Sequence, residues 1–268
     1  SIMLPRAIVA AKRISEVLST DSSIKDPELE ERLPEQMKGL LEFRNVTFRY
    51  PNAEADVLSD ISFVARPGET TAIIGSTGSG KSTLINLIPR FYDVTDGSIL
   101  LDGVDIRKMK QHTLRDKIGL VPQKGVLFTG TIESNIKFGN MSIDDEQMQK
   151  AARIAQAEEF INAKTDGYDS EISEGGTNVS GGQKQRLSIA RAIAKDPLVY
   201  IFDDSFSALD YKTDAALRKA ISQELSDRTI IIVAQRISTI MNANQILVLD
   251  EGRIVGKGTH AELLNSCE

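Results

Sequence analysis

The spacing of apolar positions divides the chain into stretches with different expected structures. Over the first 20 residues, apolar side chains recur at helical spacing, which predicts an amphipathic helix, and the polar stretch 21–27 that follows is expected to be a linker. From 41 to 101, short apolar runs bounded by Pro67-Gly68 and Asp102-Gly103 predict antiparallel strands. The opening part of the domain is therefore expected to be rich in β-structure. The apolar positions of the first helix are Ile8, Ala11, Ile14, Val17 and Leu18.

The middle of the chain changes to helical spacing. Ser142 and Asp145 have the spacing of a capping box, and the apolar face behind them predicts one helix running to about Ala163. A second helix is expected over 183–194. Beyond it, short apolar runs alternate with a helical stretch, which predicts a parallel sheet covered by helices on both faces. The expected strands are 199–202, 229–234 and 245–249, and the expected helix between the first two is 214–225.

Composition limits the possible functions. The 268 residues are 41% hydrophobic, enough for a full core, and no apolar run approaches the roughly 18 residues of a membrane helix. The net charge of −6, without a basic stripe, disfavours electrostatic binding of nucleic acid, so no nucleic-acid partner is expected. A single cysteine, Cys267, excludes a disulfide framework. Together with only two distant histidines, His112 and His260, it also makes a Cys/His metal site an unfavoured interpretation.

A glycine-rich stretch behind the apolar run 71–74 matches the phosphate-binding pattern G-x-x-x-x-G-K-[ST] at every fixed position. Its glycines let consecutive N–H groups point at phosphate oxygens, and the helix that begins near Lys81 adds the positive end of its dipole. Lys81 then reaches the β- and γ-phosphates, and the Ser82 hydroxyl is placed to ligate Mg²⁺. The alternative is a Gly/Ser-rich loop that merely joins a strand to a helix. The strand before the pattern and the amphipathic segment behind it favour a nucleoside triphosphate site. The loop consists of Gly75, Ser76, Thr77, Gly78, Ser79, Gly80, Lys81, Ser82 and Thr83.

A second part of the same site follows the apolar strand 198–202, which ends in Asp203 and Asp204. A carboxylate at the end of such a strand holds the Mg²⁺ shell in phosphate-binding-loop proteins, and Asp203 is the candidate ligand. A strand followed by a polar turn is the alternative interpretation. The phosphate-binding loop about 120 residues upstream favours the functional one.

The stretch Val179-Ser180-Gly181-Gly182-Gln183 closely resembles the signature sequence of ATP-binding-cassette (ABC) ATPases. The loop, signature and aspartate strand stand in the family's order, and the resemblance covers nearly the whole chain from about Leu41. It implies an α/β fold: a phosphate-binding-loop NTPase core with a mixed sheet, an antiparallel β subdomain and an inserted α-helical subdomain at about 124–195. It also implies ATP and Mg²⁺ as ligands, residues 26–268 as the nucleotide-binding domain, and a signature that contacts the γ-phosphate held by a second such domain.

Further positions match the family. Tyr50 corresponds to the aromatic residue that stacks on adenine, although a core tyrosine between strands is the alternative. Gln123 corresponds to the glutamine that senses Mg²⁺ and the γ-phosphate, and the stretch Ser207-Ala208-Leu209-Asp210 to the loop that crosses to the opposite site.

The resemblance also extends to segments typical of exporters. Residues 128–132 and 174–177 look like such segments, and the second implies contact with intracellular loops of a transmembrane domain. Residues 1–25 then resemble the cytosolic extension of a last transmembrane helix, with an ordinary core-packed helix as the alternative. The implied location is the cytoplasmic face of the cell membrane, as part of a transporter.

Two positions depart from the family pattern, and both belong to the chain's own hydrolytic site. Asp204 stands where the family usually has the catalytic glutamate, so its carboxylate is withdrawn by one bond, roughly 1.5 Å. Gln235 stands where the family usually has histidine, and an amide cannot carry a proton or positive charge. We therefore expect this domain to bind MgATP, hydrolyse it slowly, and complete the active site of a different partner, as one half of a heterodimeric exporter.

Three other interpretations compete with this one. A fully active cassette, possibly homodimeric, would use Asp204 as its base, and single-site kinetics would identify it. A non-transport ATPase of the chromosome-maintenance or translation-factor kind would carry a long coiled coil or a second cassette, and this sequence carries neither. A binding-only module would use ATP to dimerise, and removing Lys81 and Asp203 would then leave the partner's turnover intact.

Overall fold

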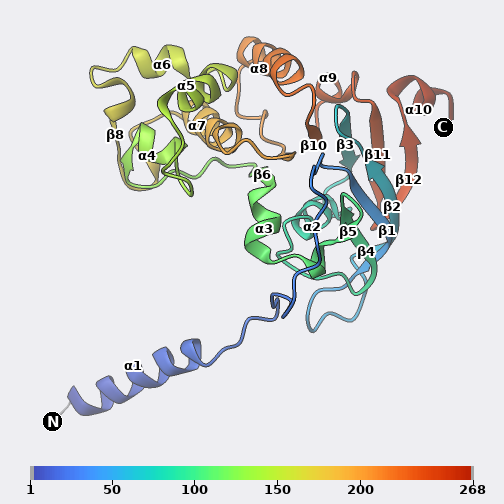
Figure 1. Cartoon of the computed structure of the whole chain (residues 1–268), viewed down its shortest axis with the longest axis horizontal. Helices are drawn as coiled ribbons and strands as arrows, with labels where there is room; N and C mark the ends of the chain where they lie inside the picture. The colour runs from blue at the N-terminus through green and yellow to red at the C-terminus, as the bar shows by residue number, and fades with distance from the viewer. Residues whose placement is uncertain (1–2, 267–268) are drawn as a thin grey trace.

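The computed structural model describes residues 3–266, so Cys267 lies outside the described part. Helix α1 (Met3–Leu18) projects away from the rest of the chain, which forms two lobes (Figure 1). The larger lobe contains the four-stranded and six-stranded β-sheets together with α2 (Lys81–Leu87), and the smaller one contains a group of helices that includes α7 (Gly181–Ala194). The site residues predicted from the sequence are distributed over both lobes.

The core of the larger lobe is a six-stranded mixed sheet. Its strand order is β12-β11-β3-β10-β9-β6; the five strands from β11 to β6 run parallel, and β12 pairs antiparallel with β11 at the edge. The predicted parallel sheet is therefore confirmed, and its two edge strands, β6 and β12, are additions to the expected strands. The strands are β3 (Thr70–Gly75), β6 (Ile118–Val121), β9 (Val199–Asp203), β10 (Thr229–Val233), β11 (Gln245–Asp250) and β12 (Arg253–Gly258).

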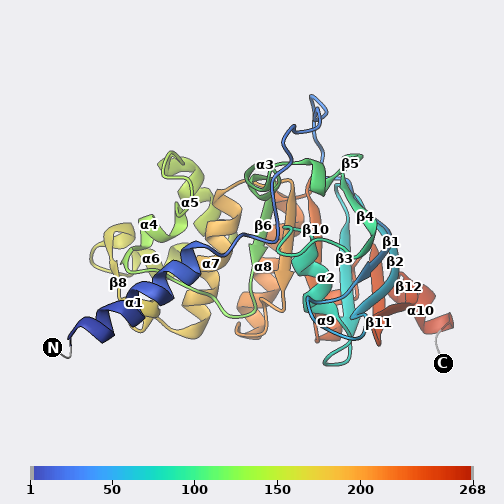
Figure 2. The ribbon, with the colours of Figure 1, turned by 90° about the horizontal axis from the view of Figure 1, so that it is seen from below.

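Alternation along the central strands explains how the sheet is covered. On β9, Tyr200 and Phe202 join a core shared with the helices of the smaller lobe, whereas Val199 and Ile201 join a core shared with α2 and the antiparallel sheet. All of these side chains are fully buried. Strands buried on both faces are typical of parallel sheets between two layers. Figure 2 shows the sheet between its covering layers.

The antiparallel β subdomain predicted from residues 41–101 is also present. Its strand order is β2-β1-β4-β5, and every pair is antiparallel. Phe43 of β1 stacks on Phe63 of β2 with ring centroids 4.6 Å apart, a cross-strand pair of the kind that stabilises sheets. The strands are β1 (Leu41–Phe48), β2 (Leu58–Ala65), β4 (Asp96–Leu101) and β5 (Val104–Asp105).

The first predicted helix of the middle segment is wrong in both its start and its length. It begins two residues later, because Asp144, not Ser142, is the N-cap and accepts a hydrogen bond from the Gln147 amide (2.8 Å). It also ends at Ile154, since Gln156 has a left-handed backbone (φ 57°) that no helix continues through. The apolar positions up to Ala163 belong to a second, separate helix. The two are α5 (Asp145–Ile154) and α6 (Glu158–Asn162).

Helix α1 is exposed over residues 5–18. Ile14, Val17 and Leu18 are 60%, 74% and 80% exposed, so the alternative of a core-packed helix is wrong for the described chain. Among residues 3–266, no helix combines the length and apolarity required to cross a bilayer. The remaining elements are α3 (Gln111–Asp116), α4 (Ile132–Ile136), α8 (Tyr211–Glu224), α9 (Ile237–Ile240), α10 (His260–Ser266), β7 (Gly130–Thr131), β8 (Glu171–Ile172) and 3₁₀ turns at Ile106–Lys108, Gly167–Asp169 and Glu174–Gly176.

Candidate nucleotide-binding site

Four neighbouring parallel strands deliver the predicted site to one edge of the sheet. Strand β3 leads into the phosphate-binding loop and β10 into Gln235, while β9 ends at Asp203 and β6 leads to Gln123. The carboxyl ends of parallel strands are where open α/β sheets bind ligands. The structure thus brings together residues that are up to about 160 positions apart in sequence.

The phosphate-binding loop has the backbone geometry that an anion site requires. Gly80 is the N-cap of α2 with φ 105°, and no side chain caps the helix, so its first-turn N–H groups stay open. Gly75 also has no space for a side chain, because a Cβ there would lie 2.3 Å from the Leu249 carbonyl oxygen. The tight approach and the uncapped helix both fit a bound phosphate group.

Lys81 and Ser82 begin α2 at this open end. The Lys81 ammonium donates to the carbonyl oxygens of Gly75 and Ser76, both at 2.8 Å, so the side chain curls over the loop. Ser82, the next residue, is exposed. A hydroxyl and a nearby carboxylate are the protein ligands expected for a Mg²⁺ that also binds phosphate oxygens. Ser82 and Asp203 therefore fit the predicted metal role.

The two aspartates have different environments. Burial raises the pKa of Asp203, the negative charge of Asp204 raises it further, and Lys81 opposes the shift. A cation placed beside Asp203 would relieve this unfavourable charge. Asp204 has a left-handed backbone (φ 45°) and donates its N–H to the Val233 oxygen at 2.8 Å, which fixes the turn after β9 to the end of β10.

The structure adds a contact that the sequence did not predict. The Gln123 amide donates to the Asp204 carboxylate, with Nε2 and Oδ2 3.1 Å apart. This hydrogen bond thus connects the Asp204 side chain to the loop that leads from β6 into the smaller lobe. Gln235, at the end of β10, is exposed. No sequence signal indicates this bond, because its partners are 81 residues apart on separate strands.

Tyr50 lies against the phosphate-binding helix. Its hydroxyl is 2.9 Å from the Thr83 hydroxyl, and its ring meets Phe48 and Tyr92 edge-on, with centroids 4.9 and 5.2 Å away. This packing includes features of the core-tyrosine alternative, and it also places the ring next to the loop. Stacking on adenine stays a prediction.

The signature residues begin α7 in the smaller lobe. The Ser180 hydroxyl accepts from the Gln183 amide, and the Gln183 side chain accepts from the Ser180 amide, both at 3.1 Å. This reciprocal cap fixes the Ser180 oxygen at the helix start while its O–H proton remains available to a ligand. Gly181 is exposed, and the Gly182 Cβ position faces the Ala208 oxygen at 3.5 Å. The signature thus lies beside the Ser207–Asp210 loop.

The loop Ser207–Asp210 is held at both ends. The Asp210 carboxylate caps α8 by accepting from the Thr213 amide (3.0 Å) and hydroxyl (2.7 Å), and these bonds lower the pKa of Asp210. At the other end, the Arg236 guanidinium donates to the Ser207 oxygen at 3.2 Å. Arg236 directly follows Gln235, so this contact, also missed from sequence, joins the two loops that flank Asp204.

The exporter-like segment 128–132 contributes Phe128 to an exposed aromatic surface on the smaller lobe. Phe128 and Phe138 stack with centroids 4.3 Å apart and are 43% and 54% exposed. Arg191 lies over both rings, at 5.3 and 5.5 Å, and burial lowers its pKa to about 10. The second segment, Glu174–Gly176, is a short 3₁₀ turn whose Gly175 oxygen accepts from Lys184 (2.8 Å). Exposed apolar surface of this kind is typical of an interaction site.

Comparison with known proteins identifies the family and the fold of this chain. A family model described as "ABC transporter" matches residues 58–207. An uncharacterized ABC transporter ATP-binding protein of Mycobacterium tuberculosis is 48% identical over 268 residues, which are 99% of this chain and 46% of that protein. The ATP-dependent lipid A-core flippase of Pseudomonas aeruginosa is 43% identical over 265 residues, which are 98% of this chain and 43% of the flippase.

A solved structure of a bacterial Atm1-family ABC exporter with ATP bound has a TM-score of 0.91 and 36% sequence identity. The match covers 98% of this chain and 46% of the exporter chain. This chain therefore spans less than half the length of these relatives. The chain belongs to the ABC transporter family. Its fold is that of an ABC ATPase, and it is a nucleotide-binding domain of the kind through which this family binds ATP.

Proposed function

We propose that this domain belongs to an ABC exporter and works as the slowly hydrolysing half of an asymmetric pair. It binds MgATP at its own loop and supplies Ser180–Gln183 to the active site of a different nucleotide-binding domain. ATP binding at both sites and hydrolysis at the partner's site would drive export of a substrate. Asp203 and Ser82 would hold Mg²⁺, which neutralises the phosphate charge.

The environment of Asp204 is the observation that carries this proposal. Its carboxylate is one bond shorter than glutamate, and it accepts the Gln123 amide at 3.1 Å, so it is drawn toward that side chain. A misplacement of about 1 Å costs on the order of 10²-fold in rate. Gln235 adds no charge at the neighbouring strand end. The binding parts, by contrast, keep their expected geometry, which supports a site that holds MgATP better than it cleaves it.

Exposed surfaces of this chain support the proposed contacts with a second nucleotide-binding domain and with a membrane domain. Ser180 and Gly181 lie exposed at the capped start of α7, where they are accessible to a second domain. The Phe128–Phe138 surface offers an apolar contact to intracellular loops, and the exposed apolar positions of α1 fit the continuation of a membrane helix. The chain covers less than half of its relatives, which leaves length for such a domain.

The composition of the assembled transporter tests this proposal. The full-length protein that contains this chain is purified from its native membrane in mild detergent with a tag, and the copurifying cassette is sequenced by mass spectrometry. We expect a second cassette with glutamate and histidine at the positions that correspond to Asp204 and Gln235. Recovery of only the tagged protein, or of a partner with the same aspartate and glutamine, would contradict the asymmetric pair.

A further inference from the structure

The segment between α1 and the first strand is attached to the domain, although it contains neither helix nor strand. We call residues 22–31 the strap. The Gln111 amide donates to the Asp26 carboxylate (2.8 Å), and the Gln111 side chain donates to the Ile24 oxygen (3.3 Å). Further along, the Lys110 amide donates to Glu30 (3.0 Å). Irregular segments are usually the mobile parts of a surface, so such a series of contacts at separate points indicates a fixed path.

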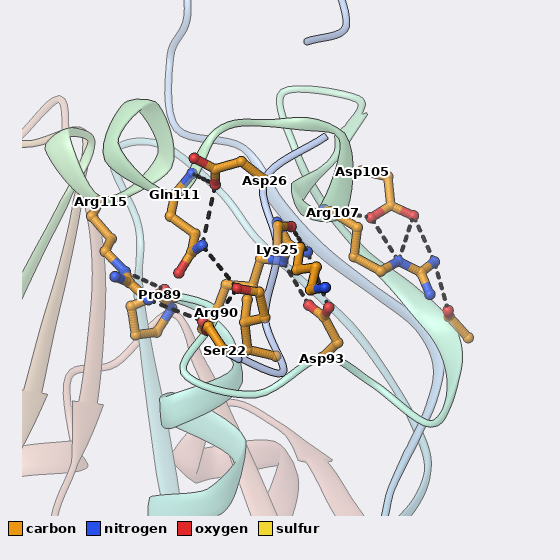
Figure 3. A network of polar contacts seen from close by, with 12 residues as sticks. Ser22, Lys25, Asp26, Pro89, Arg90, Asp93, Asp105, Arg107, Gln111 and Arg115 are labelled. Atoms are coloured by element: carbon orange, nitrogen blue, oxygen red, sulfur yellow. Dashed lines mark hydrogen bonds and ion pairs between the residues drawn. The ribbon is translucent and has the colours of Figure 1, made fainter. Parts of the chain in front are cut away.

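Arg90 attaches the strap from the other side. Its guanidinium forms a bidentate pair with Asp93, with Nε–Oδ1 at 2.6 Å and Nη2–Oδ2 at 3.0 Å, and Nη2 also donates to the Lys25 oxygen at 3.0 Å. Arg90 is 4% exposed, and a buried guanidinium depends strongly on such partners. Figure 3 shows Arg90 between Asp93 and the strap.

Arg90 stands directly behind the phosphate-binding helix. Its amide donates to the Leu87 oxygen (3.1 Å), so the turn that contains Arg90 continues α2. The same α2 begins with Lys81 and Ser82, and the helix that separates them from the Arg90 turn is only about 10 Å long. Because Leu84 and Ile85 are fully buried, α2 is a rigid connection between its two ends.

The turn at Arg90 is itself held in place. Arg90 has a left-handed backbone (φ 58°), which costs free energy for a residue with a side chain. Arg115 compensates by donating to the Pro89 oxygen (3.0 Å) and the Arg90 oxygen (3.1 Å). The Arg90 turn therefore has a defined shape that a shift of α2 would change, together with the bond to Lys25.

We propose that Arg90 is a positioning residue that couples MgATP binding at Lys81 and Ser82 to the attachment of the strap, and through the strap to α1. The proposal rests on the proposed function only in that the chain binds MgATP. Attaching the strap restricts the motion of the Arg90 turn and of α2 before the nucleotide arrives. The protein therefore loses less conformational entropy when MgATP binds to the start of α2. Attachment of the strap should then strengthen MgATP binding, and MgATP should strengthen the attachment. Thermodynamic linkage requires the two equilibrium constants to change by the same factor.

The test measures both directions of this coupling on the chain of residues 1–268. Hydrogen exchange of peptides from the strap is followed with and without MgATP, and the dissociation constant for MgATP is measured on the same samples. In the wild type we expect MgATP to slow exchange in the strap. In Arg90→Gln, we expect that slowing to disappear and MgATP to bind about fivefold more weakly, a typical low value for coupling between sites.

The chain offers a matched control. Arg107 makes the same kind of bidentate pair with Asp105 (Nη2–Oδ2 2.7 Å) and also donates to a carbonyl oxygen, that of Gly97 (3.2 Å), but not to the strap. Figure 3 also shows this pair. Arg107→Gln should retain the response of the strap to MgATP and the wild-type affinity.

Because a buried arginine can be needed for folding, the exposed contact Asp26→Ala serves as a second variant that detaches the strap from Gln111. It should weaken MgATP binding in the same direction as Arg90→Gln. Wild-type MgATP affinity in Asp26→Ala, or strap exchange in the wild type that ignores bound MgATP, would overturn the coupling. A wild-type chain without measurable MgATP binding would instead overturn the proposed function, so the two failures are distinguishable.

Discussion

Replacing Asp204 by asparagine separates a carboxylate that acts as a base from one that does not. Asparagine has the same length and can still accept the Gln123 hydrogen bond, so the variant removes only the negative charge and the ability to accept a proton. If Asp204 were the working base, its loss would cost about 10²–10⁴ in the hydrolysis rate. Because the carboxylate is about 1.5 Å short of the family position, we expect a change of less than about threefold.

The reverse substitution should restore activity. Asp204→Glu moves the carboxylate outward by one bond, and recovering an error of about 1 Å is worth on the order of 10²-fold. Gln235→His would add a group that can carry charge beside the phosphate, so the double variant should be the fastest. The rates are measured by single-turnover hydrolysis of radiolabelled MgATP at a protein concentration that favours dimers. A hundredfold loss in Asp204→Asn, or no gain in Asp204→Glu, would refute the reasoning.

Three further predictions concern the signature, the strap and stability. Ser180→Ala removes the cap of α7 at a cost of about 1 kcal/mol of unfolding free energy, yet it should leave MgATP binding to this chain unchanged and slow hydrolysis by the assembled transporter; equal loss of both would contradict the assignment of the signature to the partner's site. The backbone amides of Gln111 and Lys110 lower the pKa of Asp26 and Glu30, so the attachment they provide is fully present above the ordinary carboxylate pKa of about 4.5. It should be lost only as the pH falls through the lowered pKa values, which an NMR titration of the two amides would detect; unchanged amide shifts in acid would contradict it. Arg90, Lys110 and Thr113 also lower the pKa of one or the other carboxyl group, and the negative charge of Asp26 raises the pKa of Glu30. Asp102 accepts three amides, those of Lys38, Gly39 and Leu40, so Asp102→Ala should lower the unfolding free energy by about 1–3 kcal/mol in urea, and Asp102→Asn, which keeps one oxygen and tolerates φ 49°, by less.

The sequence predicted the chemistry that sits at strand ends, because each strand there is a continuous apolar run that stops at a functional residue. Asp203 and the loop before Lys81 are examples, and a parallel sheet necessarily brings such ends to one edge. The break at Gln156 was not predictable from periodicity, since the apolar positions of α5 and α6 follow one another at nearly the same spacing.

Contacts between polar atoms far apart in the chain also could not be predicted from the sequence. The bond from Gln123 to Asp204 depends on the exact neighbours in the sheet, and nothing in either residue indicates the other. The first part of the strap, residues 22–27, was expected to be a linker because it is polar. Its contact through the Lys25 carbonyl is made by a backbone group, which every residue has and which therefore leaves no trace in the amino-acid pattern.

The central claim is that this domain holds MgATP and cleaves it poorly, and the state of bound nucleotide tests it most directly. The chain is loaded with stoichiometric MgATP, quenched with acid at intervals, and the nucleotide is separated into ATP and ADP. The account predicts that bound nucleotide is recovered as ATP for minutes in the wild type and as ADP far sooner in Asp204→Glu with Gln235→His. Conversion by the wild type at about 10 per second, the middle of the range for ordinary enzymes, would contradict it.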